Sequence, residues 1–116
     1  MRKLLPRILE STQSNSKVRL ELLVEDDIEY FEGHFDGFAI LPGVALIGWI
    51  SHFGAEYLGT TKTSRGLDAI KFLKPILPNS RVHIEIQYLK EKASLSFVCA
   101  NETEKMASGR ILLGDS

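Results

Sequence analysis

The stretch that decides the fold is Pro42–Leu58, PGVALIGWISHFGAEYL. Proline suits the first turn of a helix, where no N–H donor is needed, and Gly59 suits the left-handed residue that follows the last turn. Apolar residues occur almost all round the expected helix and leave only a narrow stripe of small or polar residues: Gly48, Ser51, His52, Ala55 and Glu56. A helix with this pattern is expected to be largely enclosed by the rest of the protein.

Alternating segments on both sides of this helix predict strands. Residues 17–25, which we expect to be the first strand, carry apolar side chains at every second position: Val18, Leu20, Leu22 and Val24. Further strands are expected after the helix, separated by the short breaks of an antiparallel meander, over residues 67–73, 81–90, 93–101 and 105–113. This order predicts an α+β fold in which one long central helix is wrapped by a curved antiparallel β-sheet.

Composition limits the classes of partner and the compartment. The 116 residues are 44% hydrophobic and 25% charged, which is typical of one globular domain, here spanning residues 1–116. The formal net charge of −1 does not favour nucleic acid or an anionic membrane as a partner. The N-terminus lacks the apolar core of a secretory signal, and the apolar run 39–50 is too short to span a bilayer, so a cytoplasmic protein is expected. Cys99, the only cysteine, is expected to be a buried thiol and not a nucleophile.

A histidine precedes the helix and suggests chemistry at its start. His34 lies within residues 26–41, which are predicted to be an irregular loop of a length often associated with function. The Pro42-Gly43 turn then leads into the helix, whose first N–H groups lack partners within it. An imidazole that transfers protons and N–H groups that stabilise an anion could therefore face one substrate.

Two stretches carry a resemblance to a known family. Phe31–Val44, FEGHFDGFAILPGV, resembles the signature of the hotdog-fold 3-hydroxyacyl-acyl carrier protein dehydratases, in which a Gly-His-Phe-Pro-Gly segment runs into Pro-Gly-Val. Ile70–Pro78, IKFLKPILP, is similar to the next strand of that family, with a basic-Phe pair followed by two prolines. Leu41–Val44 together with Trp49 looks closest to the branch associated with aryl polyene pathways.

The resemblance implies a reaction and the residues that perform it. A 3-hydroxyacyl thioester would lose water to give the trans-2-enoyl thioester, in fatty acid or aryl polyene biosynthesis, with no cofactor and no metal expected. His34 would be the catalytic base, and the backbone N–H of Gly43 would polarise the thioester carbonyl, as the chemistry of this elimination requires. The substrate would be contacted by Phe35, Leu41, Pro42, Val44, Ile47, Gly48 and Phe72.

One position departs from the family pattern. The family carries a Glu or Asp fourteen residues after the histidine, where this chain has Gly48. His52 lies one helical turn further on the same face, and we hypothesise that it is a catalytic residue, either a substitute acid or a ligand for a polar group of the acyl chain. The alternative is a histidine wedged in an apolar helix and hydrogen-bonded to a backbone carbonyl.

The expected partner is an acyl carrier protein whose pantetheine arm holds the acyl thioester. A loose basic group could receive it or could be an ordinary solvated surface: Lys62, Arg65, Lys71, Lys74 and Arg81. The resemblance implies a homodimer, because hotdog sites are built between two subunits, although a different second subunit could supply the missing carboxylate. Two further functions stay open, namely an acyl thioesterase and a non-catalytic acyl-binding or partner subunit.

Overall fold

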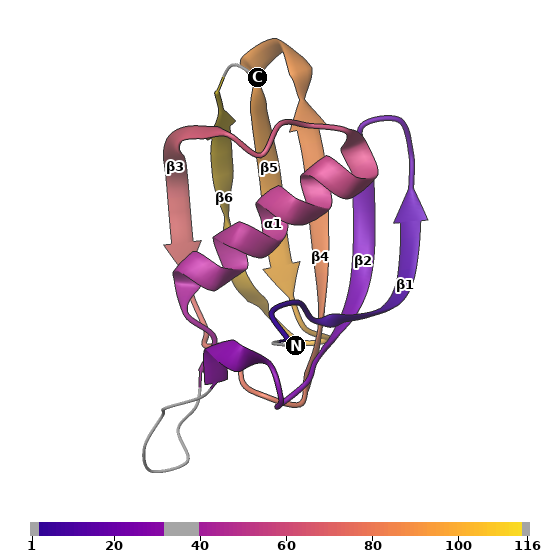
Figure 1. Cartoon of the computed structure of the whole chain (residues 1–116), viewed down its shortest axis with the longest axis vertical. Coiled ribbons are helices and arrows are strands. Elements are labelled where there is room, and N and C mark those ends of the chain that lie inside the picture. The colour runs from indigo at the N-terminus through magenta and orange to yellow at the C-terminus, as the bar shows by residue number, and fades with distance from the viewer. Residues whose placement is uncertain (1–2, 32–39, 115–116) are drawn as a thin grey trace.

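The structure, a computed structural model, describes residues 3–31 and 40–114. Within these residues, six antiparallel strands form one sheet, and a single α-helix crosses one face of the sheet diagonally (Figure 1). The spatial order of the strands is β1-β2-β4-β5-β6-β3. The strands are β1 (Arg7–Gln13), β2 (Lys17–Val24), β3 (Ser64–Phe72), β4 (Ser80–Leu89), β5 (Ser94–Ala100) and β6 (Lys105–Leu113), and the helix is α1 (Gly43–Leu58). Two short 3₁₀ helices, η1 (Glu29–Phe31) and η2 (Lys90–Lys92), complete the elements.

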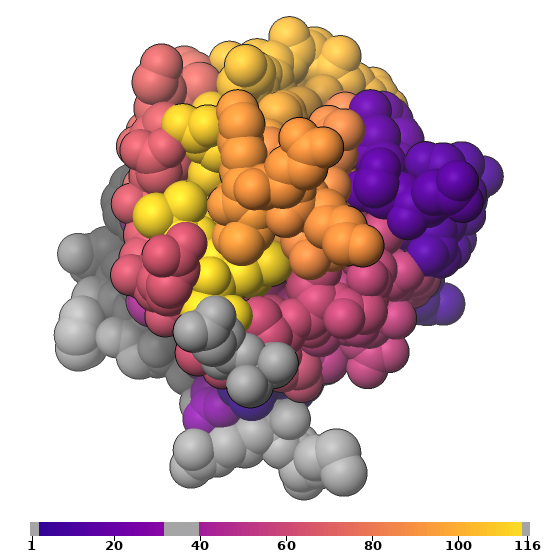
Figure 2. All heavy atoms as spheres, turned by 90° about the horizontal axis from the view of Figure 1, so that it is seen from above, coloured from indigo at the N-terminus to yellow at the C-terminus, as the bar shows by residue number. Residues whose placement is uncertain are grey.

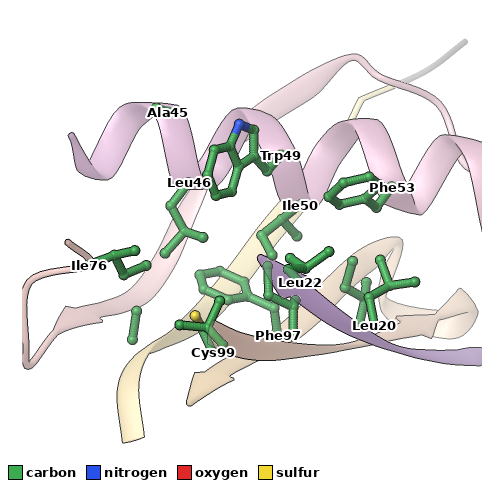
Figure 3. Packing of buried hydrophobic residues seen from close by; sticks show 14 of the residues in the cluster. Leu20, Leu22, Ala45, Leu46, Trp49, Ile50, Phe53, Ile76, Phe97 and Cys99 are labelled. Atoms are coloured by element: carbon green, nitrogen blue, oxygen red, sulfur yellow. The ribbon is translucent and has the colours of Figure 1, made fainter. Parts of the chain in front are cut away.

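The core lies between α1 and the central strands. Every second residue of β2, β4 and β5 is buried, as the alternation predicts, and α1 packs on these three strands. Figure 3 shows Leu46, Ile50 and Phe53 of the helix facing side chains of the sheet such as Leu22 and Phe97. Burying one such side chain contributes about 1.5–3 kcal/mol.

Both predicted ends of the helix are confirmed. Pro42 is the residue before the first turn, with φ −60° and ψ 143°, and Gly59 follows the last turn in the left-handed conformation with φ 71°. The N–H of Gly59 donates to the carbonyl of Ala55 at 3.2 Å, which satisfies one of the free carbonyls at the end of the helix.

The prediction that residues 17–25 form the first strand is wrong, because β1 precedes them. All seven residues of β1 are exposed, including Ile8 and Leu9 at 40% and 39%. The helix meets this edge strand at its last turn, where the Gln13 side chain donates to the carbonyl of Tyr57, but it buries no residue of β1. The sequence of β1 therefore lacks the alternation of apolar and polar residues that marks β2. Figure 2 shows the molecule along its long axis, with the N-terminal strands in indigo at one lateral edge and β3 at the other.

The expectation that α1 is largely enclosed holds for only one of its faces. Trp49, Ile50 and Phe53 are at most 2% exposed, whereas Val44 is 80% exposed. The sheet of one chain covers one side of the helix, and the described residues leave the outer side open. Among those residues, no helix has the length and apolarity needed to cross a lipid bilayer.

The close packing of α1 on β5 makes Gly54 a position where a methyl group should be harmful. A Cβ there would lie 2.6 Å from Cδ1 of the buried Leu95. Overpacking typically costs about 1–3 kcal/mol, against a gain of about 1 kcal/mol for replacing a helical glycine by alanine. We expect Gly54→Ala to lower the free energy of unfolding in urea, by up to about 2 kcal/mol.

Gly48→Ala is the matched control, because among the described residues no heavy atom outside the helix's own backbone and the neighbouring residues lies within 4 Å of a Cβ built at that glycine. That variant should be more stable than the wild type by about 1 kcal/mol. Equal stability of the two variants would contradict the packing argument.

The expectation that Cys99 is a buried thiol is confirmed. Its side chain lies in the core on β5, and burial raises the pKa of the thiol from 9.0 to about 12. We therefore expect no reaction of the folded protein with a thiol reagent at pH 8, and one modified thiol per chain in denaturant, counted by mass spectrometry.

The same shift in pKa predicts how stability depends on pH. Above pH 9.0 the thiol ionises in the unfolded chain, while the folded one stays protonated. The contribution of Cys99 to the free energy of unfolding is therefore complete below pH 9.0 and is lost as the pH rises towards about 12. Rapid labelling of Cys99 under native conditions would contradict both statements.

Candidate functional site

The first turn of α1 offers backbone N–H groups without acceptors. Pro42 provides no side-chain hydrogen bond to cap the helix. Within the described part of the chain, no acceptor lies within hydrogen-bond distance of the N–H groups of Gly43 and Val44, since the first bonded N–H groups are those of Ala45 and Leu46. Such N–H groups, together with the helix dipole, stabilise a negative charge.

The approach to this turn is fixed by hydrogen bonds to the segment after β3. The N–H of Leu41 donates to the carbonyl of Ile76 at 2.8 Å. The N–H groups of Leu73 and Lys74 both donate to the carbonyl of Met106 on β6, at 2.8 and 3.1 Å. The start of the helix and the end of β3 are therefore held to the same end of the sheet.

A cavity of about 320 Å³, here called the helix-start pocket, lies between these segments. Its lining brings together three residues that the sequence predicted at the site, namely Leu41, Gly43 and Phe72, with Lys74 nearby. The ring of Phe72 lies over the helix start, since a Cβ on Gly43 would be 2.6 Å from Cζ of Phe72. Glycine at position 43 therefore leaves room for the aromatic ring beside the free N–H groups.

A second cavity, of about 540 Å³ and here called the flank recess, borders the N-terminal segment. Gly48 and His52 both line it, which confirms that they share one face of α1. The other lining residues are Lys3, Leu4, Leu5, Tyr30 and Trp49. The two cavities share no lining residue, so within one chain Gly43 does not meet His52.

The N-terminal segment forms one wall of the flank recess and is firmly anchored. The indole N–H of Trp49 donates to the carbonyl of Leu4 at 2.9 Å, and the N–H of Glu29 donates to the carbonyl of Lys3 at 2.7 Å. The Lys3 ammonium pairs with Glu25 and Asp27, and these contacts, the Glu25 hydrogen bond first, raise the pKa of Lys3. These long-range contacts are the part of the site that the sequence pattern did not predict.

His52 is half-buried, and its ring meets that of Phe53 edge-on, with the centroids 5.4 Å apart. None of the hydrogen bonds among the described residues involves the imidazole of His52. The described residues therefore do not support the alternative in which this histidine is hydrogen-bonded to a backbone carbonyl. Of the other predicted residues, Pro42 precedes the helix, while Val44 and Ile47 line neither cavity. His34 and Phe35 lie outside the described residues, so their roles stay predictions.

The predicted basic group is divided by the fold. Lys62 and Arg65 lie at the start of β3, where the Arg65 Nε–H donates to the carbonyl of Leu113 at 2.7 Å. Lys71 and Lys74 lie at the other end of the strand, and only Lys74 lines the helix-start pocket. Lys74 is also 3.8 Å from a carboxylate oxygen of Glu104, an exposed pair that contributes little to stability.

Comparison with known proteins agrees with this arrangement. Residues 10–110 match the family model of the ApeI-like proteins, described as ApeI dehydratase. The 3-hydroxyacyl-[acyl-carrier-protein] dehydratase FabZ of Clostridium perfringens is 26% identical over 107 residues, which cover 86% of this chain and 76% of the relative.

Two solved structures share the fold. The dehydratase heterocomplex ApeI:P of Xenorhabdus doucetiae superposes with a TM-score of 0.88 at 24% identity, covering 95% of this chain and 98% of the other. An uncharacterised protein from Erwinia carotovora subsp. atroseptica superposes with a TM-score of 0.78 at 32% identity, covering 92% and 94%. The helix across a six-stranded antiparallel sheet is thus the hotdog fold, and the chain belongs to the ApeI-like dehydratase family.

Proposed function

We propose that this protein is a 3-hydroxyacyl thioester dehydratase that acts on substrates carried by an acyl carrier protein. The observation that carries the proposal is the first turn of α1, where no described residue accepts a hydrogen bond from the N–H groups of Gly43 and Val44 and where Gly43 lines the helix-start pocket. Membership of a dehydratase family supports the reaction type, and relatives such as the Clostridium perfringens FabZ are named for the carrier-linked substrate.

The elimination needs a base for the proton at C2 and a stabilised oxygen at C1. His34 takes the proton, and the electrons left on C2 delocalise onto the thioester oxygen, which the N–H of Gly43 stabilises. Removing one such donor from other enzymes typically costs about 3–4 kcal/mol in the transition state. These electrons then form the C2–C3 double bond as the C3–O bond breaks.

The departing hydroxyl needs a proton, which Gly48 cannot supply. Three titratable side chains line the flank recess with Gly48, namely Lys3, Tyr30 and His52. Of these, His52 lies one helical turn from Gly48, and an imidazole is the side-chain group that ordinarily titrates near neutrality, so we assign the proton to its imidazolium. The hydroxyl leaves as water, His34 ends protonated and His52 ends neutral, and exchange with solvent restores both.

Gly43 and His52 line different cavities of one chain. For the N–H of Gly43 and the imidazole of His52 to act on the same substrate, the two groups must come from two subunits. The free edge of β3 and the open side of α1 offer the contact surface, with exposed apolar side chains that include Val44 at 80%, Phe72 at 55% and Leu67 at 50%. A homodimer formed there would place the helix-start pocket of one chain next to the helix of the other.

A heterodimer is the second candidate, and Gly48 is the observation that favours it. A different subunit with a carboxylate at the corresponding helix position would complete the site containing His34. The Xenorhabdus doucetiae structure is itself a dehydratase heterocomplex. In this case the isolated chain would bind acyl groups without turning them over.

Two histidine variants test the proposed reaction. His34→Ala should lower turnover of a 3-hydroxyacyl carrier protein by about 10²–10⁴-fold, and His52→Gln by about 10²-fold or more, since each removes a group that transfers a proton. The gain or loss of water is followed by mass spectrometry in both directions.

His83→Gln, at a half-buried histidine on β4, is the matched control and should keep full activity. Unchanged activity of His52→Gln, with His34→Ala inactive, would remove His52 from the mechanism. A folded wild-type protein without turnover, active only with a second hotdog subunit, would support the heterodimer.

The position of Lys74 at the helix-start pocket predicts a contact with the carrier or with the phosphate of its pantetheine arm. Surface charge pairs are worth up to about 1 kcal/mol, which corresponds to about fivefold in affinity. We expect Lys74→Glu to raise KM for the carrier-linked substrate by about this factor and to leave kcat nearly unchanged.

Lys62→Glu, which adds the same charge near the start of β3, is the control and should have no effect. A short pantetheine thioester without phosphate should not distinguish Lys74→Glu from the wild type. Equal effects of the two lysine variants would indicate a general charge effect.

A further inference from the structure

The three glycines inside α1 have different surroundings. An added Cβ would meet the ring of Phe72 at Gly43, and it would meet Leu95 and Thr60 at Gly54. At Gly48, no side chain of residues 3–31 or 40–114 beyond its chain neighbours lies within 4 Å of it. Packing therefore explains the first two glycines and does not explain the third.

Glycine is also an unfavourable choice at position 48. The residue lies in the interior of a 16-residue α-helix, where glycine is less stable than alanine because it loses more backbone freedom on folding. Its backbone is not in the left-handed region that requires glycine. Neither the conformation nor the contacts of the described chain account for Gly48, which leaves a bound ligand or a second subunit as the group that uses this space.

The surroundings of Gly48 indicate what binds. The flank recess is about 540 Å³, and its walls include Leu4, Leu5, Tyr30 and Trp49. Trp49 is 1% exposed and is fixed by its hydrogen bond to the carbonyl of Leu4, so this part of the wall is held in place. The missing side chain at position 48 makes the floor of the recess bare helix backbone.

We propose that Gly48 determines specificity by admitting acyl groups that are broader than an unbranched chain, because a branch or a ring can lie against the helix backbone in the flank recess. This inference rests on the proposed function for its ligand, an acyl thioester. A thin unbranched chain would gain little from the added width, whereas a branch or ring buries further apolar surface against Trp49 and the leucines. One methylene of misfit in an apolar pocket changes selectivity by about 10–200-fold, which sets the scale of the effect.

The test compares the wild type with Gly48→Leu, which fills the recess, and with Ala55→Leu, a control on the same helix that lines neither cavity. The ligands are 3-hydroxyacyl pantetheine thioesters with unbranched, branched and ring-bearing acyl groups of equal carbon number. Thioether analogues of the same three groups, which cannot undergo the reaction, are titrated in parallel by calorimetry.

We expect the wild type to bind and convert either the branched or the ring-bearing acyl group better than the unbranched one, and the comparison of these two ligands shows which of them is preferred. Gly48→Leu should lower affinity and kcat/KM for the preferred group at least tenfold more than it lowers those for the unbranched one. Ala55→Leu should behave as the wild type. Gly48→Ala should raise Tm and weaken the preference in part, which would separate the role in specificity from any role in stability.

The outcomes separate this inference from the proposed reaction. If the thioesters are not turned over but the analogues show the Gly48-dependent preference, the reaction is wrong and the specificity role stands. If turnover is normal and Gly48→Leu affects all three groups equally, the specificity role is overturned and the reaction stands. If Gly48→Leu changes the oligomeric state in light scattering without changing the preference, Gly48 serves a subunit contact and the inference is overturned.

Discussion

The packing of one face of α1 against β2, β4 and β5 is the constraint on which the rest of the structure depends. It holds the helix diagonally across the sheet, so that its first turn lies beside the end of β3 and its last turn near β2 (Figure 1). Both cavities follow from this placement, because each lies at one flank of the helix where the sheet does not cover it. The free N–H groups of Gly43 and Val44 are likewise useful only because the helix start is fixed next to a cavity.

The sequence predicts the elements that the core itself defines. The alternation in residues 17–25, 81–90 and 93–101 corresponds to β2, β4 and β5, whose inner faces are buried under the helix. The edge strands are different. β1 is exposed along its whole length and has no periodic signal, and β3 begins three residues before the predicted segment, at Ser64. The register of β3 shifts twice, and Ala69 has a φ of 54°, so a strict alternation could not mark this strand.

The candidate site also has one part that the sequence predicts and another that it does not. Leu41, Gly43 and Phe72 could be grouped from the motif, since the residues after β3 run alongside the helix start, and the structure brings them together. The contacts of Trp49 with Leu4, and of Glu29 with Lys3, join segments far apart in the chain and have no local signature. The spacing of Gly48 and His52 gave their shared face correctly, but it carried no information on which side of α1 the helix-start pocket would lie.

The position of the N-terminal segment affects how the ligand preference of such a protein can evolve. Residues Lys3–Leu5 of this segment shape the flank recess and lie before the first strand, and of their side chains only that of Leu5 packs against the core cluster. Leu4 is 43% exposed and bonds to Trp49 only through its backbone carbonyl, so a substitution of its side chain changes the recess at less cost to folding than one at the buried Ile50 or Phe53. The fold thus separates a buried scaffold from a more exposed wall, and new ligand preferences can arise by substitutions in that wall.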